Sequence, residues 1–155
     1  MSDEEETRIN LALAGRSGAA LLRYGRARGL GDPVLVILVW EGTDAAALKH
    51  RHSVSERVLS RWSGRRLPSR VARAWEKGRF SGPYLRDELM DRRILVDTLE
   101  TATTWDRLGL LHADVASVIR SSLEVDGARA AVMCHVSHVY AAGASLYFTL
   151  SLIHI

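Results

Sequence analysis

Hydrophobic and polar residues alternate most regularly near the end of the chain, in the segment 134–150. Leucine or phenylalanine occupies every second position from Leu146 to Leu152, and serine, tyrosine or threonine occupies the positions between them. A period of two is typical of a β-strand with one buried face. A four-residue turn, 141–144, separates this strand from an earlier one that begins at Cys134. The segment is therefore predicted to form a β-hairpin.

The register of this hairpin decides which polar side chains meet. If Tyr140 and Ser145 close the turn, the antiparallel ladder places His138 directly opposite Tyr147, with Cβ atoms roughly 5 Å apart. An imidazole beside a phenol on an exposed sheet face is suited to handling protons. Tyr147 and His138 are therefore candidate catalytic residues.

The first part of the chain combines helical patterns with a strand. Ser2 and Glu5 have the spacing of a capping box, which predicts a helix that ends near Gly15. The uniformly apolar run 34–40 predicts a central strand covered on both faces. The glycine- and arginine-rich segment between Gly15 and this run can be either helical or irregular.

Caps, turns and periodicity predict further elements between this run and the hairpin. They are, in order, a helix that begins after Thr43 or Asp44, a helix over 69–80, a helix opened by Gly82 and Pro83, a strand over 94–101 with Leu95 and Leu99 inward, and a helix that begins at Thr103 or Thr104 and ends near Gly127. Strands flanked by amphipathic helices favour an α+β fold, with a mainly antiparallel sheet and helices packed on one face.

Length and composition fit one globular domain. The chain has 155 residues, of which 47% are hydrophobic and 25% are charged, and these values are typical of a folded domain. The only cysteine, Cys134, excludes an internal disulfide and is expected to be a buried, unreactive thiol. The first ten residues lack the pattern of a signal peptide, and the longest apolar run is far shorter than a membrane span. We therefore expect a soluble, cytoplasmic protein.

Basic residues are concentrated between Leu48 and Phe80. This segment holds ten lysines and arginines, against only Glu56 and Glu76. Such a block can bind nucleic acid or an anionic membrane surface, and it can also be a solvated surface without a partner. No zinc-ligand spacing or nucleic-acid-binding motif accompanies it. Binding of nucleic acid is therefore not predicted.

The six histidines do not suggest a metal site. His50 and His52 are two positions apart on a predicted helix, so their side chains do not share a face. His112 has no acidic residue four positions further along its helix and is taken as structural. His135 and His138 point to opposite sides of their strand. No metal is predicted, and the sequence contains no glycine-rich phosphate loop.

Three sequence blocks and the hairpin, in this order, resemble a known family. The blocks are AWEKGRF at 74–80, GPYLRD at 82–87 and LVDTLETATTW at 95–105. They resemble the substrate-binding (cap) region of the alkyldihydroxyacetonephosphate synthases, which are FAD-linked oxidases of the vanillyl-alcohol-oxidase type. The resemblance is dense from about Arg73 to Leu150 and weaker before it. It implies a ferredoxin-like cap domain, with residues 1–155 as a single partial FAD-linked oxidase C-terminal domain from which the FAD-binding domain is absent.

The resemblance also implies an activity, namely exchange of the acyl group of acyl-dihydroxyacetone phosphate for a fatty alcohol in ether lipid synthesis. The implied cofactor is FAD, and the exchange reaction brings no net change in redox state. By position, Tyr147 matches a tyrosine that removes a proton from the carbon next to the ketone, and His138 would tune it. Arg86 matches an arginine that holds substrate near the flavin, and Thr98 falls where the family has a small hydroxyl residue. Peripheral contact with a membrane is a further expectation, whereas this chain alone is expected to bind no FAD and to be inactive.

Two alternatives stay open at this point. FAD-dependent 2-hydroxyacid dehydrogenases share the cap, but their hairpin carries histidine metal ligands where this chain has the turn 141–144 and Tyr147. The second alternative is a non-catalytic fragment that binds anionic partners through its basic block, Arg51–Arg79. Neither the chain length of the substrate nor the oligomeric state follows from the sequence.

Overall fold

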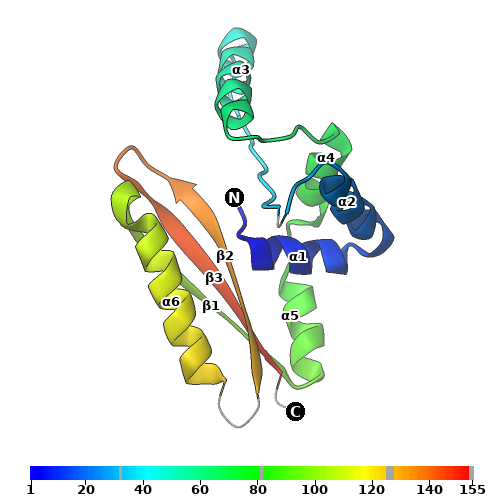
Figure 1. Ribbon diagram of the computed structural model, residues 1–155, viewed down its shortest axis with the longest axis vertical. Coiled ribbons are helices and arrows are strands. Elements are labelled where there is room, and N and C mark those ends of the chain that lie inside the picture. Colours follow the sequence, from blue (N-terminus) through cyan, green and yellow to red (C-terminus); the bar gives the residue numbers. More distant parts are fainter. Residues whose placement is uncertain (32, 81, 125–127, 154–155) are drawn as a thin grey trace. The chain divides into compact units, whose positions relative to one another are not determined.

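The chain, drawn in Figure 1 as a computed structural model, divides into two compact units. Residues Met1–Val36 and Pro83–Ile155 form the first, the sheet unit, and Ile37–Gly82 form the second, the helical unit. The predicted hairpin lies in the sheet unit, and the basic block lies in the helical unit. The structure describes residues 1–31, 33–80, 82–124 and 128–153.

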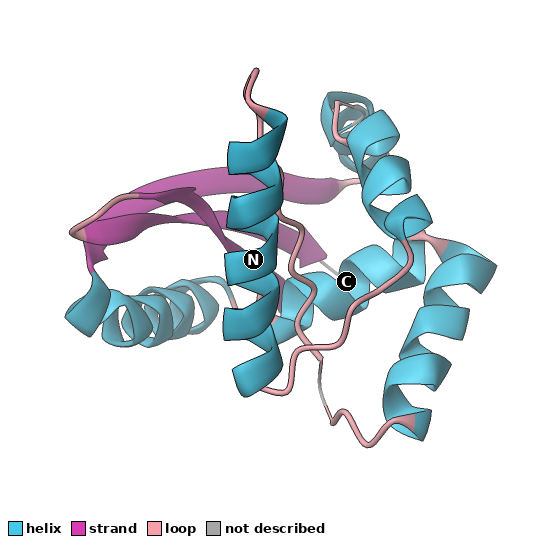
Figure 2. Cartoon of the chain, turned by 90° about the horizontal axis from the view of Figure 1, so that it is seen from above, coloured by secondary structure: helices cyan, strands magenta, loops and turns pink. Residues whose placement is uncertain are grey.

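The sheet unit is built on three antiparallel strands. These are β1 (Ile94–Thr104), β2 (Arg129–Val139) and β3 (Gly143–Ile153), in the spatial order β1-β3-β2. The connection from β1 to β2 runs through a 3₁₀ turn (Trp105–Arg107) and helix α6 (Leu108–Leu123), which forms a second layer against the sheet (Figure 2). This β-α-β-β order is the first part of a ferredoxin-like arrangement. The predicted α+β fold with a mainly antiparallel sheet is confirmed.

The core of the sheet unit lies between the sheet and α6. Phe148 of β3 is 0% exposed, and Val132, Cys134 and Leu146 are buried beside it. Ala116 of α6 is buried in the same cluster, and partly buried apolar residues surround it. The alternation along β3 therefore identified the buried face of this strand correctly, and the predicted burial of Cys134 is confirmed.

The two leucines of β1 that were predicted to face inward are less buried than expected. Leu99 pairs with Phe148 and Leu95 pairs with Leu152, so both leucines lie on the same sheet face as the core, as directly paired residues do. They nevertheless stay 42% and 52% exposed, because the core cluster is made of residues of α6, β2 and β3 and does not extend over β1. Both leucines thus face the side of the core as predicted, but neither is buried in it.

The first helix begins one residue later than the capping box predicted. Helix α1 (Glu4–Leu13) is capped by Asp3, whose Oδ1 accepts the Glu6 N–H at 2.8 Å. Ser2 is instead held in an extended bridge to His135, at the outer edge of β2. This bridge fixes the backbone of Ser2 and moves the cap to Asp3. A second helix, α2 (Gly15–Ala27), occupies the segment that the sequence left open.

The apolar run 34–40 is not a strand, which corrects the prediction. Its hydrogen bonds go to the first residues of the chain, since Leu35 O accepts the Ser2 N–H and Leu35 N–H donates to Thr7 Oγ1. Val34, Leu38 and Val39 are exposed. Apolar β-branched residues favour a strand only where a neighbouring strand completes the hydrogen bonds, and none does so here among the described residues.

Local signals placed the remaining helices well. In the helical unit, α3 (Ala45–Arg61) begins after Asp44, whose carboxylate accepts the N–H groups of Ala46 and Ala47. Helix α4 (Ser69–Gly78) follows after a loop, and α5 (Gly82–Asp91) begins at Gly82 as predicted. No helix among the described residues is both long enough and apolar enough to span a bilayer.

The helix after β1 departs from its predicted bounds. Thr103 and Thr104 belong to β1, and neither caps α6, which begins at Leu108. The strand extends further than predicted because its last residue, Thr104, still pairs with Gly143 of β3. The helix ends at Leu123, and its predicted end at Gly127 lies outside the described residues.

Candidate functional site

The candidate site is the face of the sheet that points away from α6. Tyr147, in the central strand β3, pairs with Glu100 of β1 on one side and with His135 of β2 on the other. Directly paired residues of antiparallel strands share a face. These three side chains therefore form the centre of a polar sheet face, and Thr98, two positions before Glu100 on β1, shares it.

The structure corrects the predicted partner of Tyr147, because His135 and not His138 lies opposite it. The hairpin turn closes between Tyr140 and Gly143, whose carbonyl accepts the Tyr140 N–H at 2.8 Å. An irregularity in the ladder between Val136 and Val139 then displaces the residues around His138 from regular pairing. A tighter turn and this bulge together shift the register from the one expected.

Tyr147 lies against an imidazole that a carboxylate holds in place. The rings of His135 and Tyr147 stack, with centroids 5.2 Å apart and an interplanar angle of 24°. His135 Nδ1 lies 3.0 Å and 3.2 Å from the two carboxylate oxygens of Glu6, on α1. The side chains of His135 and Glu6 are only 33% and 13% exposed. This arrangement fixes the orientation of the imidazole, and with it one side of the Tyr147 ring.

A second set of polar side chains lies around Glu100. Ser137 Oγ donates a 2.7 Å hydrogen bond to Glu100 Oε1, and His138 Nδ1 lies 3.4 Å from the same oxygen. The hydrogen bond from Ser137, followed by the hydrogen bond and charge of His138, lowers the pKa of Glu100 below its ordinary value. His138 therefore belongs to the polar sheet face through Glu100 rather than through Tyr147.

The two predicted substrate-binding residues occupy different places. Thr98 is exposed on the polar sheet face, opposite Thr149. Arg86 lies on α5 with its side chain 59% exposed, and its Nε is 3.8 Å from the carboxylate of Asp87. Within the described residues, no hydrogen bond or ion pair joins Arg86 to the polar sheet face. The structure thus brings together Tyr147, Thr98 and, through Glu100, His138, but it does not bring Arg86 to them.

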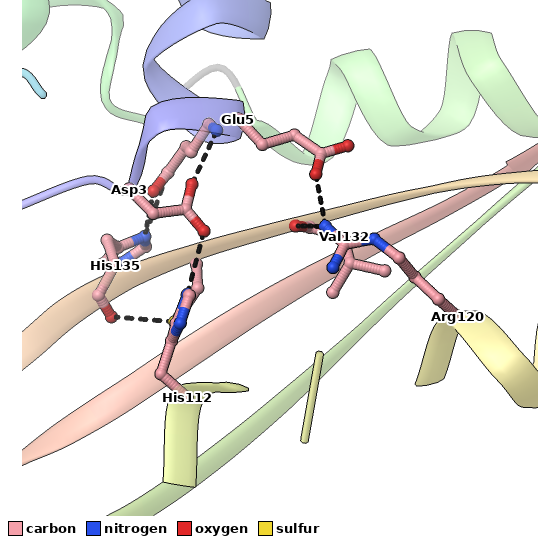
Figure 3. Close-up of polar contacts among 8 residues, drawn as sticks. Asp3, Glu5, His112, Arg120, Val132 and His135 are labelled. Carbon is pink, nitrogen blue, oxygen red and sulfur yellow. Dashed lines mark hydrogen bonds and ion pairs between the residues drawn. The ribbon is translucent and has the colours of Figure 1, made fainter. Parts of the chain in front are cut away.

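The acidic first turn of α1 makes further contacts, which Figure 3 shows. Asp3 Oδ2 lies 3.2 Å from His112 Nε2 on α6, and Glu5 pairs with Arg120 on the same helix. The His112 ring also stacks on Phe148 at 5.9 Å. These contacts fasten α1 to α6 across the edge of β2. These contacts were not predicted from the sequence, because the partners are more than 100 positions apart.

A cavity of about 530 Å³ lies beside these ion pairs. Its wall includes Leu108, Cys134, Val136 and Leu146, in addition to the polar residues of the first turn of α1. The side chains that could hold a charged ligand already bind one another, as the pairs in Figure 3 show. Among the described residues there is no group of three or more potential metal ligands. The polar sheet face is therefore the better candidate for chemistry.

The buried thiol of Cys134 gives a direct test of the core on which this site rests. Burial raises the pKa of Cys134 to about 12, and the carboxylates of Asp3 and Glu6 add to the effect. Because the thiolate is the reactive form, we expect iodoacetamide at pH 8 to leave the folded protein unlabelled and to label it after unfolding in urea.

The raised pKa of Cys134 also makes the free energy of unfolding depend on pH. Between the unfolded pKa of about 8.5 and the folded value, only the unfolded state loses the proton of Cys134, so stability should fall as the pH rises through this range. Labelling of folded and unfolded protein at equal rates would contradict the buried position of Cys134.

Comparisons with known proteins agree on one family. A family model described as FAD linked oxidases, C-terminal domain, matches residues 1–152. The alkyldihydroxyacetonephosphate synthase of Dictyostelium discoideum is 30% identical over 94% of this chain and 25% of its own length. That of Trypanosoma brucei brucei is 25% identical over 95% of this chain and 25% of its own length.

Comparison with solved structures indicates the same family. An alkyldihydroxyacetonephosphate synthase crystallised in P1 superposes with a TM-score of 0.76 and 28% sequence identity, over 97% of this chain and 29% of the other. A second crystal form of that name, in P212121, gives a TM-score of 0.75. The chain thus spans about a quarter of the length of the curated relatives it matches. By sequence and by structure, it belongs to the family of the FAD-linked oxidases, C-terminal domain.

Proposed function

We propose that the chain is the substrate-binding part of an FAD-dependent enzyme of the alkyldihydroxyacetonephosphate synthase type. The complete enzyme would exchange the acyl group of acyl-dihydroxyacetone phosphate for a fatty alcohol and so make an ether bond. The observation that carries this proposal is Tyr147, in the middle of a polar sheet face and stacked on His135. The relatives that bear the name of this enzyme support it.

In this proposal Tyr147 removes the proton from the carbon next to the ketone. The phenolate oxygen accepts that proton, and the electron pair of the C–H bond is left on the carbon. A phenol has an ordinary pKa near 10, so a tyrosine base depends on its neighbours. His135, held by Glu6, takes the part that the sequence had given to His138, because His135 stacks on the Tyr147 ring whereas His138 stacks on Tyr140. His138 would act indirectly, through Glu100.

Arg86 and Thr98 are proposed to bind the substrate. A guanidinium can hold a phosphate with two parallel N–H donors. The ion pair of Arg86 with Asp87 is long and exposed, and such pairs contribute little free energy, so the guanidinium can exchange this partner for a phosphate. Thr98 offers a hydroxyl on the same face as Tyr147. The two residues would thus serve the phosphate and the polar end of the substrate.

FAD is proposed as the cofactor of the complete enzyme, where it would supply the group that carries the substrate during exchange. The described residues do not fit the dinucleotide by themselves. Their sheet is antiparallel, whereas a dinucleotide cradle is commonly built from parallel strands and a glycine-rich loop at a helix N-terminus. Arg86 is the residue of this chain that we propose to lie near the flavin. We expect the chain alone to bind no FAD and to show no turnover.

A titration with dihydroxyacetone phosphate tests the proposed substrate surface on the chain itself. In two-dimensional NMR spectra of the 155-residue protein, we expect amide shifts at Thr98, Glu100, Tyr147 and Arg86. Inorganic phosphate serves as the control for plain anion binding and should affect Arg86 without Tyr147. An Arg86→Gln variant should lose most of the response to both compounds. Shifts confined to the arginine-rich segment 48–80, or identical patterns with the two compounds, would overturn the proposal.

A further inference from the structure

The proposed exchange reaction involves two protons at one carbon. In acyl-dihydroxyacetone phosphate, a carbon next to the ketone also carries the acyl group, and Tyr147 is proposed to take a proton from this carbon. The fatty alcohol must lose its own proton when its oxygen bonds to the same carbon. A phenol oxygen that already holds one proton is a poor acceptor for another. The site therefore needs a second proton acceptor beside Tyr147.

His135 has a ring nitrogen that can accept this proton. Its other nitrogen, Nδ1, lies 3.0 Å and 3.2 Å from the two carboxylate oxygens of Glu6. A carboxylate only accepts hydrogen bonds, so the proton of the neutral imidazole lies on Nδ1. The hydrogen bond at one ring nitrogen thus determines the state of the other. Nε2 of His135 keeps its lone pair.

This lone pair is accessible from outside the protein. Within the described part of the chain, no hydrogen bond or ion pair involves His135 Nε2. The same residues include no buried side-chain nitrogen or oxygen that lacks a partner. Since Nε2 has no partner, it is not buried. The carboxylate behind the ring is better shielded, because the Glu6 side chain is only 13% exposed.

The imidazole lies next to the candidate base. His135 and Tyr147 are directly paired on β2 and β3, and their rings stack with centroids 5.2 Å apart. Directly paired residues share a face, so both side chains lie on the polar sheet face. A phenol oxygen and an imidazole nitrogen at this spacing can serve two substituents of one carbon.

Two other carboxylate–imidazole pairs of the sheet unit are built differently. Asp3 contacts His112 through Nε2, and this ring stacks on Phe148 of the core, so the pair fastens α1 to α6. The side chains of Glu100 and His138 are 45% and 66% exposed, and solvent screens such a pair. Neither pair combines a shielded carboxylate with an imidazole that opens on the polar sheet face.

We propose that Glu6 and His135 form a carboxylate–imidazole dyad in which His135 Nε2 takes the proton of the fatty alcohol. The O–H bond of the alcohol breaks, and its oxygen forms the new C–O bond. The acyloxy group leaves as a carboxylate with the electrons of the old C–O bond. Glu6 stabilises the imidazolium, which then releases its proton to water. His135 is thus a catalytic residue and Glu6 a positioning residue. This inference rests on the proposed function and adds the group that activates the second substrate.

The protonation state of the ring can be measured on the 155-residue protein itself. In long-range ¹H–¹⁵N spectra at about pH 8, where an imidazole is largely neutral, His135 should carry its proton on Nδ1. Glu6→Gln should lose this preference, because an amide can donate to Nδ1 as well as accept from it. Glu5→Gln is the matched control, since it removes a carboxylate of the same helical turn that pairs with Arg120. It should leave the spectrum of His135 unchanged. A proton on Nε2 in the wild type would overturn the proposal.

Two partial reactions separate the dyad from Tyr147. They are measured in a chimera in which this chain replaces the matching quarter of the Dictyostelium discoideum synthase. Deuterium uptake by acyl-dihydroxyacetone phosphate in D₂O without alcohol follows the C–H proton, and incorporation of labelled alcohol follows the whole exchange. Glu6→Gln should leave deuterium uptake unchanged and reduce incorporation about 10²-fold, since a general base contributes roughly 10²–10⁴-fold. Tyr147→Phe should reduce both.

The outcomes distinguish this inference from the proposed function. Full incorporation in the Glu6→Gln chimera, or equal losses of incorporation and deuterium uptake, would overturn the dyad. A chimera with the unmodified chain that shows neither reaction would instead contradict the proposed function.

Rescue by a small base separates proton transfer from a structural role. His135→Ala removes the imidazole, and imidazole added to the buffer should restore part of the alcohol incorporation in this chimera. His138→Ala is the matched control from the same strand; it leaves the dyad intact and should gain nothing from added imidazole. No restoration in His135→Ala, or equal gains in both variants, would overturn the proposal.

Discussion

Tyr147→Phe is expected to reduce alkyl exchange by about 10³-fold, because a positioned general base contributes roughly 10²–10⁴-fold to a rate. The assay requires a complete enzyme, so the variant is made in a chimera in which this chain replaces the matching quarter of the Dictyostelium discoideum synthase. Incorporation of labelled fatty alcohol measures the exchange. The flavin content should not change, because the phenylalanine keeps the ring that stacks on His135.

Controls for this prediction lie in the same hairpin. Tyr140→Phe removes an equivalent hydroxyl from an exposed tyrosine next to the turn and should preserve the exchange rate. His135→Phe should reduce the rate more than His138→Phe, since His135 stacks on Tyr147 and His138 stacks on Tyr140. Full exchange activity in the Tyr147→Phe chimera would remove this tyrosine from the mechanism.

Phe148→Ala is expected to destabilise the sheet unit by about 4 kcal/mol, since truncating a fully buried phenylalanine costs about 3–5 kcal/mol. Phe148 is 0% exposed and lies at the centre of the cluster between the sheet and α6. The loss combines the apolar area that is no longer buried with the cavity that is left. Urea denaturation, followed by circular dichroism, measures the free energy of unfolding.

Leu110→Ala is the matched control for this prediction. Leu110 lies on α6 but is 65% exposed, so its truncation should change the free energy of unfolding by no more than about 0.5 kcal/mol. A loss below about 1 kcal/mol in Phe148→Ala would mean that this face of the sheet is not the core.

The parts of the fold that the sequence predicted correctly depend on local signals. The alternation along β3 identified the buried face that carries Leu146 and Phe148, because a strand turns its side chains to opposite faces in succession. Asp44 capped α3 as expected, and Gly82 opened α5. Caps and periodicity act within a few residues, so they can be read without knowledge of the rest of the molecule.

The wrong predictions concern partners distant in sequence. A strand was expected at 34–40, but no strand among the described residues pairs with it, and Leu35 binds Ser2 and Thr7 instead. The hairpin register depended on where the turn closes. Gly143 approaches β1 so closely that a Cβ there would lie 2.0 Å from the Thr103 carbonyl oxygen, and this contact is invisible in the local sequence.

The candidate site, too, was predicted correctly where local patterns decide it and wrongly where residues distant in sequence decide it. The alternation along β3 placed Tyr147 on the polar face correctly, whereas the position of Thr98 on the same face follows from the pairing of β1 with β3, which was not predicted. The partner of Tyr147 was wrong by three positions, since a tighter turn and a bulge brought His135 opposite it. The contact of Glu6 with His135 could not be predicted, because 129 positions separate the two residues.

The most direct test of the account is the activity of the chimera with the unmodified chain. The chimera joins the three-quarters of the Dictyostelium discoideum synthase that this chain does not match to residues 1–155 of this protein. If the chain is the substrate-binding part of such an enzyme, the purified chimera should hold FAD and incorporate labelled fatty alcohol into acyl-dihydroxyacetone phosphate. A folded chimera with a full complement of FAD and no alkyl exchange would contradict the account.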